Sequence, residues 1–192
     1  MKNSSVSQEP TPILTVNKWK FITWLFIISI VMLFASQTSA YLVRRAEGNW
    51  IEFTIPTIFY TSTLVLVVSS VLLHLALVAA RKDEFPQVQR YITGALISGI
   101  AFLIMQYFGW LDLQAQGVYL KGNPSGSFFY ILSGLHGVHL VSGLGVIIAA
   151  FISARRLKIH SKSLVQLEVC NTYWHFLDLL WVYLFVFLLY FR

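Results

Sequence analysis

Residues Phe53 to Ala80 read FTIPTIFYTSTLVLVVSSVLLHLALVAA, a run of the length of a membrane span without one formally charged residue. In a helix, about 20 apolar residues at about 1.5 Å each span the roughly 30 Å hydrocarbon core of a bilayer. Four further runs are similarly long and apolar, although the last contains Asp178. We therefore expect an all-α integral membrane protein, a bundle of five transmembrane helices at approximately 21–43, 54–80, 91–111, 128–154 and 170–191.

The composition of the 192-residue chain agrees with a lipid environment. Hydrophobic residues make up 57% of it, aromatic residues 16% and charged residues only 11%. Soluble domains usually carry about a quarter charged residues, so this chain lacks the polar side chains to cover a water-exposed surface. We divide it into a polar N-terminal tail, 1–20, and a transmembrane domain, 21–192. A single cysteine, Cys170, excludes an internal disulfide framework and any CxxC motif.

The basic residues are distributed unevenly between the two ends of the predicted bundle. Ten of the 14 Lys and Arg lie in the N-terminal tail and in the connections after the second and fourth runs. Because cytoplasmic segments carry the excess of Lys and Arg, we expect the N-terminus inside and the C-terminus outside. The formal charge of +6 therefore reflects membrane topology. We expect no nucleic-acid partner, because the chain has no basic face interleaved with aromatic side chains.

Chemistry within the spans would depend on five ionisable residues, since such groups are costly in lipid and tend to face protein or water. They are His74, His136, His139, His175 and Asp178. From the residues alone we favour a structural polar network that holds the helices together. A metal or haem site and a proton or ion path are the alternatives.

Depth along the helices separates these residues. His139 lies about 24 Å from the inner boundary and Asp178 about 15 Å, so the pair on the fourth helix and the pair on the fifth are not expected to bind one metal. His74 and His175 both lie about 10 Å deep, which leaves a bis-histidine haem protein as an alternative. A small transporter is a further alternative, weakened because the chain lacks inverted repeats and helices broken midway.

Two other groups of residues suggest roles. Ser133, Gly134 and Gly137 form a small-residue face on the fourth helix, which we expect to pack against a neighbouring helix. At the predicted inner surface, contact with lipid head groups or the collection of protons is expected of Asp83, Glu84, His160 and Glu168.

Asp178 should point into the bundle, because a charged carboxylate facing lipid would cost several kcal/mol. We expect it to accept hydrogen bonds from His74, His175 or tryptophan side chains at a similar depth.

Specific motifs in the second half of the chain suggest a family. They are Phe128-Phe129-Tyr130, the heptapeptide SGLHGVH at 133–139 and the nonapeptide YWHFLDLLW at 173–181. Together they closely resemble subunit III of the haem-copper terminal oxidases, which comprise cytochrome c oxidases and quinol oxidases. The resemblance covers essentially residues 20–192 and is to the short, five-helix form.

The resemblance implies a non-catalytic accessory subunit of a proton-pumping terminal oxidase in aerobic respiration, located in the bacterial cytoplasmic (inner) membrane. It implies contact with subunit I, which it would flank and stabilise, with subunit II and other small subunits, and with phospholipids. It implies no catalytic residue, cofactor or metal in this chain, since haem and copper belong to the partner subunits. Assistance to proton uptake is also implied. Many members carry a glutamate where this chain has Ile30, so a role of that acid is not carried over.

Overall fold

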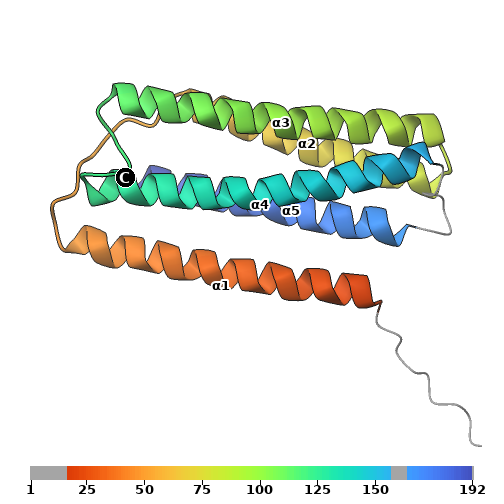
Figure 1. The fold of residues 1–192 in the computed structure, drawn as a ribbon, viewed down its shortest axis with the longest axis horizontal. Coiled ribbons are helices and arrows are strands. Elements are labelled where there is room, and N and C mark those ends of the chain that lie inside the picture. Colours follow the sequence, from red (N-terminus) through yellow and green to blue (C-terminus); the bar gives the residue numbers. More distant parts are fainter. Residues whose placement is uncertain (1–16, 157–163, 192) are drawn as a thin grey trace, which may run out of the picture.

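The computed structural model describes residues 17–156 and 164–191, and within these ranges it contains five α-helices and no strand. The helices are α1 (Lys18–Ala46), α2 (Ile58–Arg81), α3 (Phe85–Ala115), α4 (Pro124–Arg155) and α5 (Val165–Phe191). All five are long and apolar enough to cross a membrane. The predicted all-α, five-helix membrane fold is confirmed, and Figure 1 shows the helices lying side by side along one direction.

Several helix ends differ from those expected from the uncharged runs. α3 begins at Phe85 and ends at Ala115, so it includes the charged residues Arg90 and Asp112. An uncharged run marks the part of a helix inside hydrocarbon, whereas the helix itself continues into the polar head-group region. α2 instead begins later than expected, at Ile58, because Pro56 disfavours helical geometry in the residue before it.

The start of α4 and the end of α2 have specific capping arrangements. Asn123 caps α4, accepting a hydrogen bond from the backbone N–H of Ser125 at 2.9 Å, and Pro124 occupies the first turn. At the end of α2, Asp83 adopts a φ of 56°. The N–H of Glu84 then donates to the carbonyl of Ala79, which is the Schellman arrangement. This tight turn folds α3 back along α2.

The five helices are not equally engaged. α2, α3, α4 and α5 form a packed bundle, whereas α1 contacts only α4 and α5 among the described helices and lies to one side (Figure 1). At the end where α1 begins, α2 and α4 end and α3 and α5 begin. We call this the basic end, because Lys20, Arg81 and Arg155 are found there.

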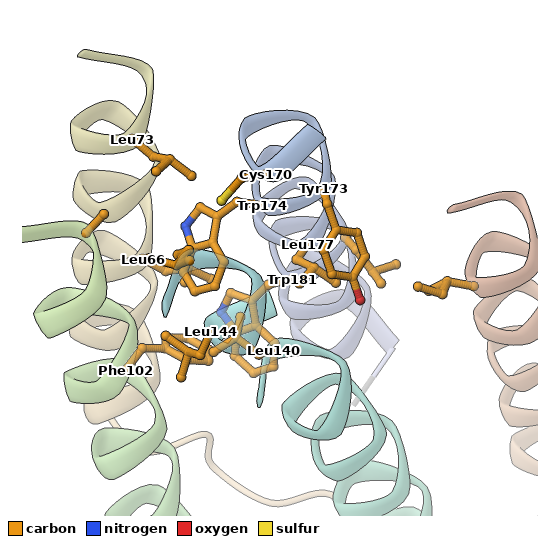
Figure 2. Packing of buried hydrophobic residues seen from close by; sticks show 14 of the residues in the cluster. Leu66, Leu73, Phe102, Leu140, Leu144, Cys170, Tyr173, Trp174, Leu177 and Trp181 are labelled. Atoms are coloured by element: carbon orange, nitrogen blue, oxygen red, sulfur yellow. The ribbon is translucent and has the colours of Figure 1, made fainter. Parts of the chain in front are cut away.

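Two tryptophans of α5 form the centre of the bundle. Trp174 is fully buried and Trp181 is 1% exposed. In Figure 2 they lie among Leu66, Phe102 and Leu144, whereas Tyr173 points toward α1. A Cβ added at Gly99 would lie 2.9 Å from the Trp174 ring, so glycine at this position of α3 leaves room for the large side chain that α5 directs into the bundle.

Candidate functional site

α2 and α5 bring two of the predicted site histidines together. The ring centroids of His74 and His175 are 6.0 Å apart, in agreement with the equal depths expected from the sequence. Ser70 lies one turn before His74 on α2, and its hydroxyl forms a hydrogen bond with Nδ1 of His175. Sequence reasoning did not identify Ser70. Its spacing of four residues from His74, which places both on one helix face, was the available signal.

Asp178 lies one turn beyond His175 and is 6% exposed, so it points into the protein. It lies beside the Ser70 hydroxyl. The hydrogen bonds expected from His74, His175 or tryptophan are not formed, because neither carboxylate oxygen has a hydrogen-bond partner among the described residues. This part of the prediction was wrong.

The donors expected at Asp178 are used elsewhere. Nε1 of Trp174 donates to the Ser69 hydroxyl at 3.1 Å, and Nε1 of Trp181 donates to the Thr63 hydroxyl at 3.0 Å. These α2 hydroxyls were not predicted as partners. Hydroxyl side chains at membrane helix interfaces are, however, the groups that bind across helices.

The two histidines of α4 lie apart from this cluster. His136 is fully buried, and its ring centroid lies 5.1 Å from that of Trp181 and 6.2 Å from that of Phe102. Neither of its ring nitrogens has a hydrogen-bond partner among the described residues. Nδ1 of His139 lies 2.8 Å from the carbonyl oxygen of Leu135 in the same helix. The expected network of five residues is therefore divided. Within the described ranges, no group of three or more His, Cys, Asp or Glu residues is arranged to hold a metal ion.

The small-residue face of α4 packs over only part of its length. The indole N–H of Trp110 donates to the Ser133 hydroxyl at 3.1 Å, and a Cβ at Gly134 would lie 3.7 Å from the same ring. At Gly137, by contrast, an added Cβ would meet nothing within 4 Å, so the expected contact with a helix of this chain is not made. The neighbouring His136 and His139 do pack against other helices, with their rings on Phe102 and Phe34 respectively.

A cavity of about 320 Å³ opens at the basic end between α1, α2 and α5. Its polar lining includes Lys20, Arg81, Glu168 and Asn171, and Nζ of Lys20 lies 2.7 Å from Oε2 of Glu168. Of the predicted inner-surface residues, Glu168 therefore lines this cavity. Asp83 and Glu84 form the turn between α2 and α3, whereas His160 lies outside the described residues.

An apolar groove of about 480 Å³ lies between α1 and α5. It is lined by Val31, Phe34, Ala35, Phe176, Leu179, Leu180 and Tyr183. Its walls are aliphatic and aromatic, which suits a hydrocarbon chain.

Comparison with known proteins gives a consistent result. The family described as Cytochrome c oxidase subunit III matches residues 11–192. The Cytochrome c oxidase subunit 3 of Thermostichus vulcanus is 30% identical over 171 residues, which cover 85% of this chain and 82% of that protein. The Probable cytochrome c oxidase subunit 3 of Nocardia farcinica is 30% identical over 173 residues, with coverages of 85% and 83%. The Cytochrome c oxidase subunit 3 of Corynebacterium diphtheriae is 26% identical over 172 residues, with coverages of 85% and 83%.

Proposed function

This chain belongs to the cytochrome c oxidase subunit III family and is an accessory subunit of a terminal oxidase, and we propose that it flanks and stabilises the catalytic subunit I. The observation that carries the proposal is the family match over residues 11–192, which includes every described helix. Family membership favours this function over the bis-histidine haem protein and the small transporter. The chain is a multi-pass membrane protein, and its bacterial relatives support a place in the bacterial cytoplasmic membrane.

We assign haem and copper to partner subunits, with subunit II and other small subunits as further neighbours. The three histidines His136, His139 and His175 have contacts that suit structural roles. Nδ1 of His175 binds Ser70, His139 binds a carbonyl of its own helix, and His136 is enclosed by aromatic rings. A polar pair between helices, such as that of Ser70 and His175, contributes modestly, about 0.6 kcal/mol on average, but it helps to fix the arrangement of the helices.

The test is purification in mild detergent with an affinity tag on this chain. We expect a haem- and copper-containing core to co-purify with it, and the chain released from that core to show no Soret absorption. A monodisperse chain with its own Soret band, lost on substitution His175→Ala, would instead establish the bis-histidine haem protein.

We also propose that the basic end faces the cytoplasm, which places the N-terminus inside and the C-terminus outside. The distribution of Lys and Arg supports this orientation. Two single-site variants test it, because Lys82 follows α2 at the basic end and Lys121 precedes α4 at the opposite end. In intact cells, a membrane-impermeant maleimide should label Lys121→Cys and spare Lys82→Cys. The reverse pattern would invert the topology.

An apolar groove and nearby basic residues support contact between this chain and phospholipids. The apolar groove between α1 and α5 is of a kind that accepts an acyl chain, and Lys20 and Arg81 carry positive charge at the basic end. Each basic residue near an anionic membrane surface contributes about 1 kcal/mol of attraction. Lipid analysis of the purified complex should show less retained anionic phospholipid for Lys20→Gln/Arg81→Gln than for the parent chain. Equal retention would remove the head-group role of these two residues.

Proton collection at the same surface remains a separate proposal for Asp83, Glu84, His160 and Glu168. The position of Glu168 supports it, since this carboxylate lines the polar cavity at the basic end. Neutralising all four residues should lower oxidase turnover and the proton-to-electron ratio at alkaline pH. Unchanged values of both would exclude the role.

A further inference from the structure

Four side chains between α2 and α5 form a continuous series that runs from the surface into the protein. His74 is exposed, and its ring lies 6.0 Å from that of His175, which is half-buried. His175 is hydrogen-bonded to the hydroxyl of Ser70, which is 8% exposed. The Ser70 hydroxyl lies beside Asp178, which is 6% exposed. Exposure thus falls step by step toward the carboxyl group.

The exposed end of this series lies next to the cavity at the basic end. Leu77 lines that cavity and lies three residues after His74, on the same face of α2. Thr172 also lines it and lies three residues before His175 on α5. The series therefore begins about one helical turn farther from the basic end than the polar cavity. It ends at Asp178, which lies one turn farther still than His175.

Three helices contribute charged and titratable groups to the series and to the cavity beside it. α1 contributes Lys20, α2 contributes His74 and Arg81, and α5 contributes Glu168 and His175. All of them lie on the cavity side of Asp178. From α4, His136 packs on Trp181, and from α3, Gln106 donates to the Ser62 hydroxyl.

The surroundings of Asp178 determine which form of the carboxyl group is stable. A buried carboxylate that lacks both a counter-ion and a hydrogen-bond donor is very costly, and such a group is stabilised by taking up a proton. Asp178 has no hydrogen-bond partner on either oxygen in the described residues. A serine hydroxyl can rotate and can donate one hydrogen bond while accepting another, so Ser70, which binds His175 and lies beside Asp178, can turn its proton toward the carboxyl group.

We propose that His74, His175, Ser70 and Asp178 form an intramembrane proton-exchange site, in which Asp178 holds a proton that equilibrates with water at the basic end. The inference goes beyond the accessory role, because it assigns a bound proton and a route to residues of this chain. It does not depend on assembly with an oxidase.

The exchange can be written without any further reactant. A proton from water in the cavity, relayed at His74, binds Nε2 of His175. Nδ1 of His175 then releases its proton to the Ser70 oxygen, and the Ser70 hydroxyl proton passes to a carboxylate oxygen of Asp178. One proton enters at the histidine and one arrives at the carboxyl group, so Ser70 is unchanged. The reverse sequence empties the site.

The test is infrared spectroscopy of the full-length chain in lipid vesicles, following the C=O band of a protonated carboxyl group on transfer to D₂O. We expect a band that shifts in D₂O and is absent from Asp178→Asn. In Ser70→Ala the band should remain, but its shift should be slowed about a hundredfold, the usual contribution of a positioned proton-transfer group. Ser70→Thr retains a hydroxyl and should restore most of the rate.

Ser69→Ala is the matched control. Ser69 is the neighbouring buried serine, but its hydroxyl donates to the carbonyl of Ala95 and accepts from Trp174, without contacting His175. Its removal should leave the exchange rate unchanged. Should Ser70→Ala fail to fold, His175→Gln tests the same route and should slow exchange similarly. Identical spectra for the parent and Asp178→Asn, or equal exchange rates in Ser70→Ala or His175→Gln and in the parent, would overturn the proposal.

Discussion

α1 and α5 are both apolar membrane helices, yet they occupy very different environments. In the most apolar 18-residue stretch of α5, 50% of the residues are buried inside the protein, whereas in the corresponding stretch of α1 only 22% are buried. Lipid chains are as apolar as leucine, so hydrophobicity gives a helix no preference between lipid and protein. What distinguishes α5 is its set of specific contacts, such as the indole N–H groups donated to hydroxyls of α2.

α1 is held by a few contacts distributed along its length. The Tyr41 hydroxyl donates to the carbonyl of Phe191 at 3.0 Å, and the Tyr183 hydroxyl donates to Thr38 at 3.3 Å. Lys20 pairs with Glu168 at the opposite end of the helix. α5 therefore forms the centre of the packed bundle, whereas α1 is a peripheral helix. Loss of α1 should lower the stability of the other four helices only slightly.

The largest expected effect distinguishes the two helices directly. Trp174→Ala on α5 should lower the free energy of unfolding by about 3–5 kcal/mol, because it leaves a cavity at a fully buried site. Trp19→Ala on α1 is the control, since Trp19 is 59% exposed and its loss should change stability by no more than about 0.5 kcal/mol. Unfolding of the chain in mixed detergent micelles measures both. Equal losses would mean that α1 is as integral as α5.

A second, smaller effect concerns the packing of the Trp174 ring of α5 against Gly99 of α3. Gly99→Ala places a Cβ 2.9 Å from the Trp174 ring, and overpacking of this kind costs about 1–3 kcal/mol. Gly137→Ala is matched in chemistry but meets nothing within 4 Å, so it should be neutral or should stabilise α4 by up to about 1 kcal/mol. The same unfolding experiment compares the two. If Gly137→Ala destabilises the chain only in the assembled oxidase, Gly137 packs against a partner subunit.

A third effect is confined to α1. Tyr41→Phe removes the hydrogen bond to Phe191 and should cost about 0.6 kcal/mol, the average for polar pairs between membrane helices. Amide hydrogen exchange should become faster at the C-terminal end of α1 and remain unchanged in α5. Tyr190→Phe, at a residue 79% exposed, serves as the control and should change neither helix. Faster exchange throughout the bundle would contradict the peripheral role of α1.

The smallest effect is expected at the ion pair between Lys20 and Glu168. Both side chains are partly exposed, and pairs of this type contribute about 0–1 kcal/mol. Lys20→Ala should therefore reduce stability slightly at low ionic strength, and the difference from the parent chain should disappear at about 1 M salt. Lys121→Ala, at the opposite end of the bundle, should show no difference at either salt concentration. A salt-independent loss would indicate packing of the Lys20 stem rather than charge.

The sequence allowed some features of the candidate site to be predicted and not others. The closeness of His74 and His175 followed from depth alone, because rise per residue is constant along a helix. That the expected donors do not bind Asp178 could not be predicted, because it depends on the other groups that those donors contact. These groups are the hydroxyls of Ser69, Ser70 and Thr63 on α2. The open space at Gly137 likewise could not be predicted, because it depends on how the whole bundle packs.

The number of helices, the membrane environment and the family could be read from the amino-acid sequence, because uncharged length, charge distribution and the motifs at 133–139 and 173–181 are local properties. Which apolar faces meet protein and which meet lipid depends on the packing of the helices. This packing also divided the five ionisable residues, bringing His74, His175 and Asp178 together and leaving His136 among aromatic rings. The physical reason is that lipid and protein interiors are equally apolar, so the choice rests on shape and on hydrogen bonds between distant residues.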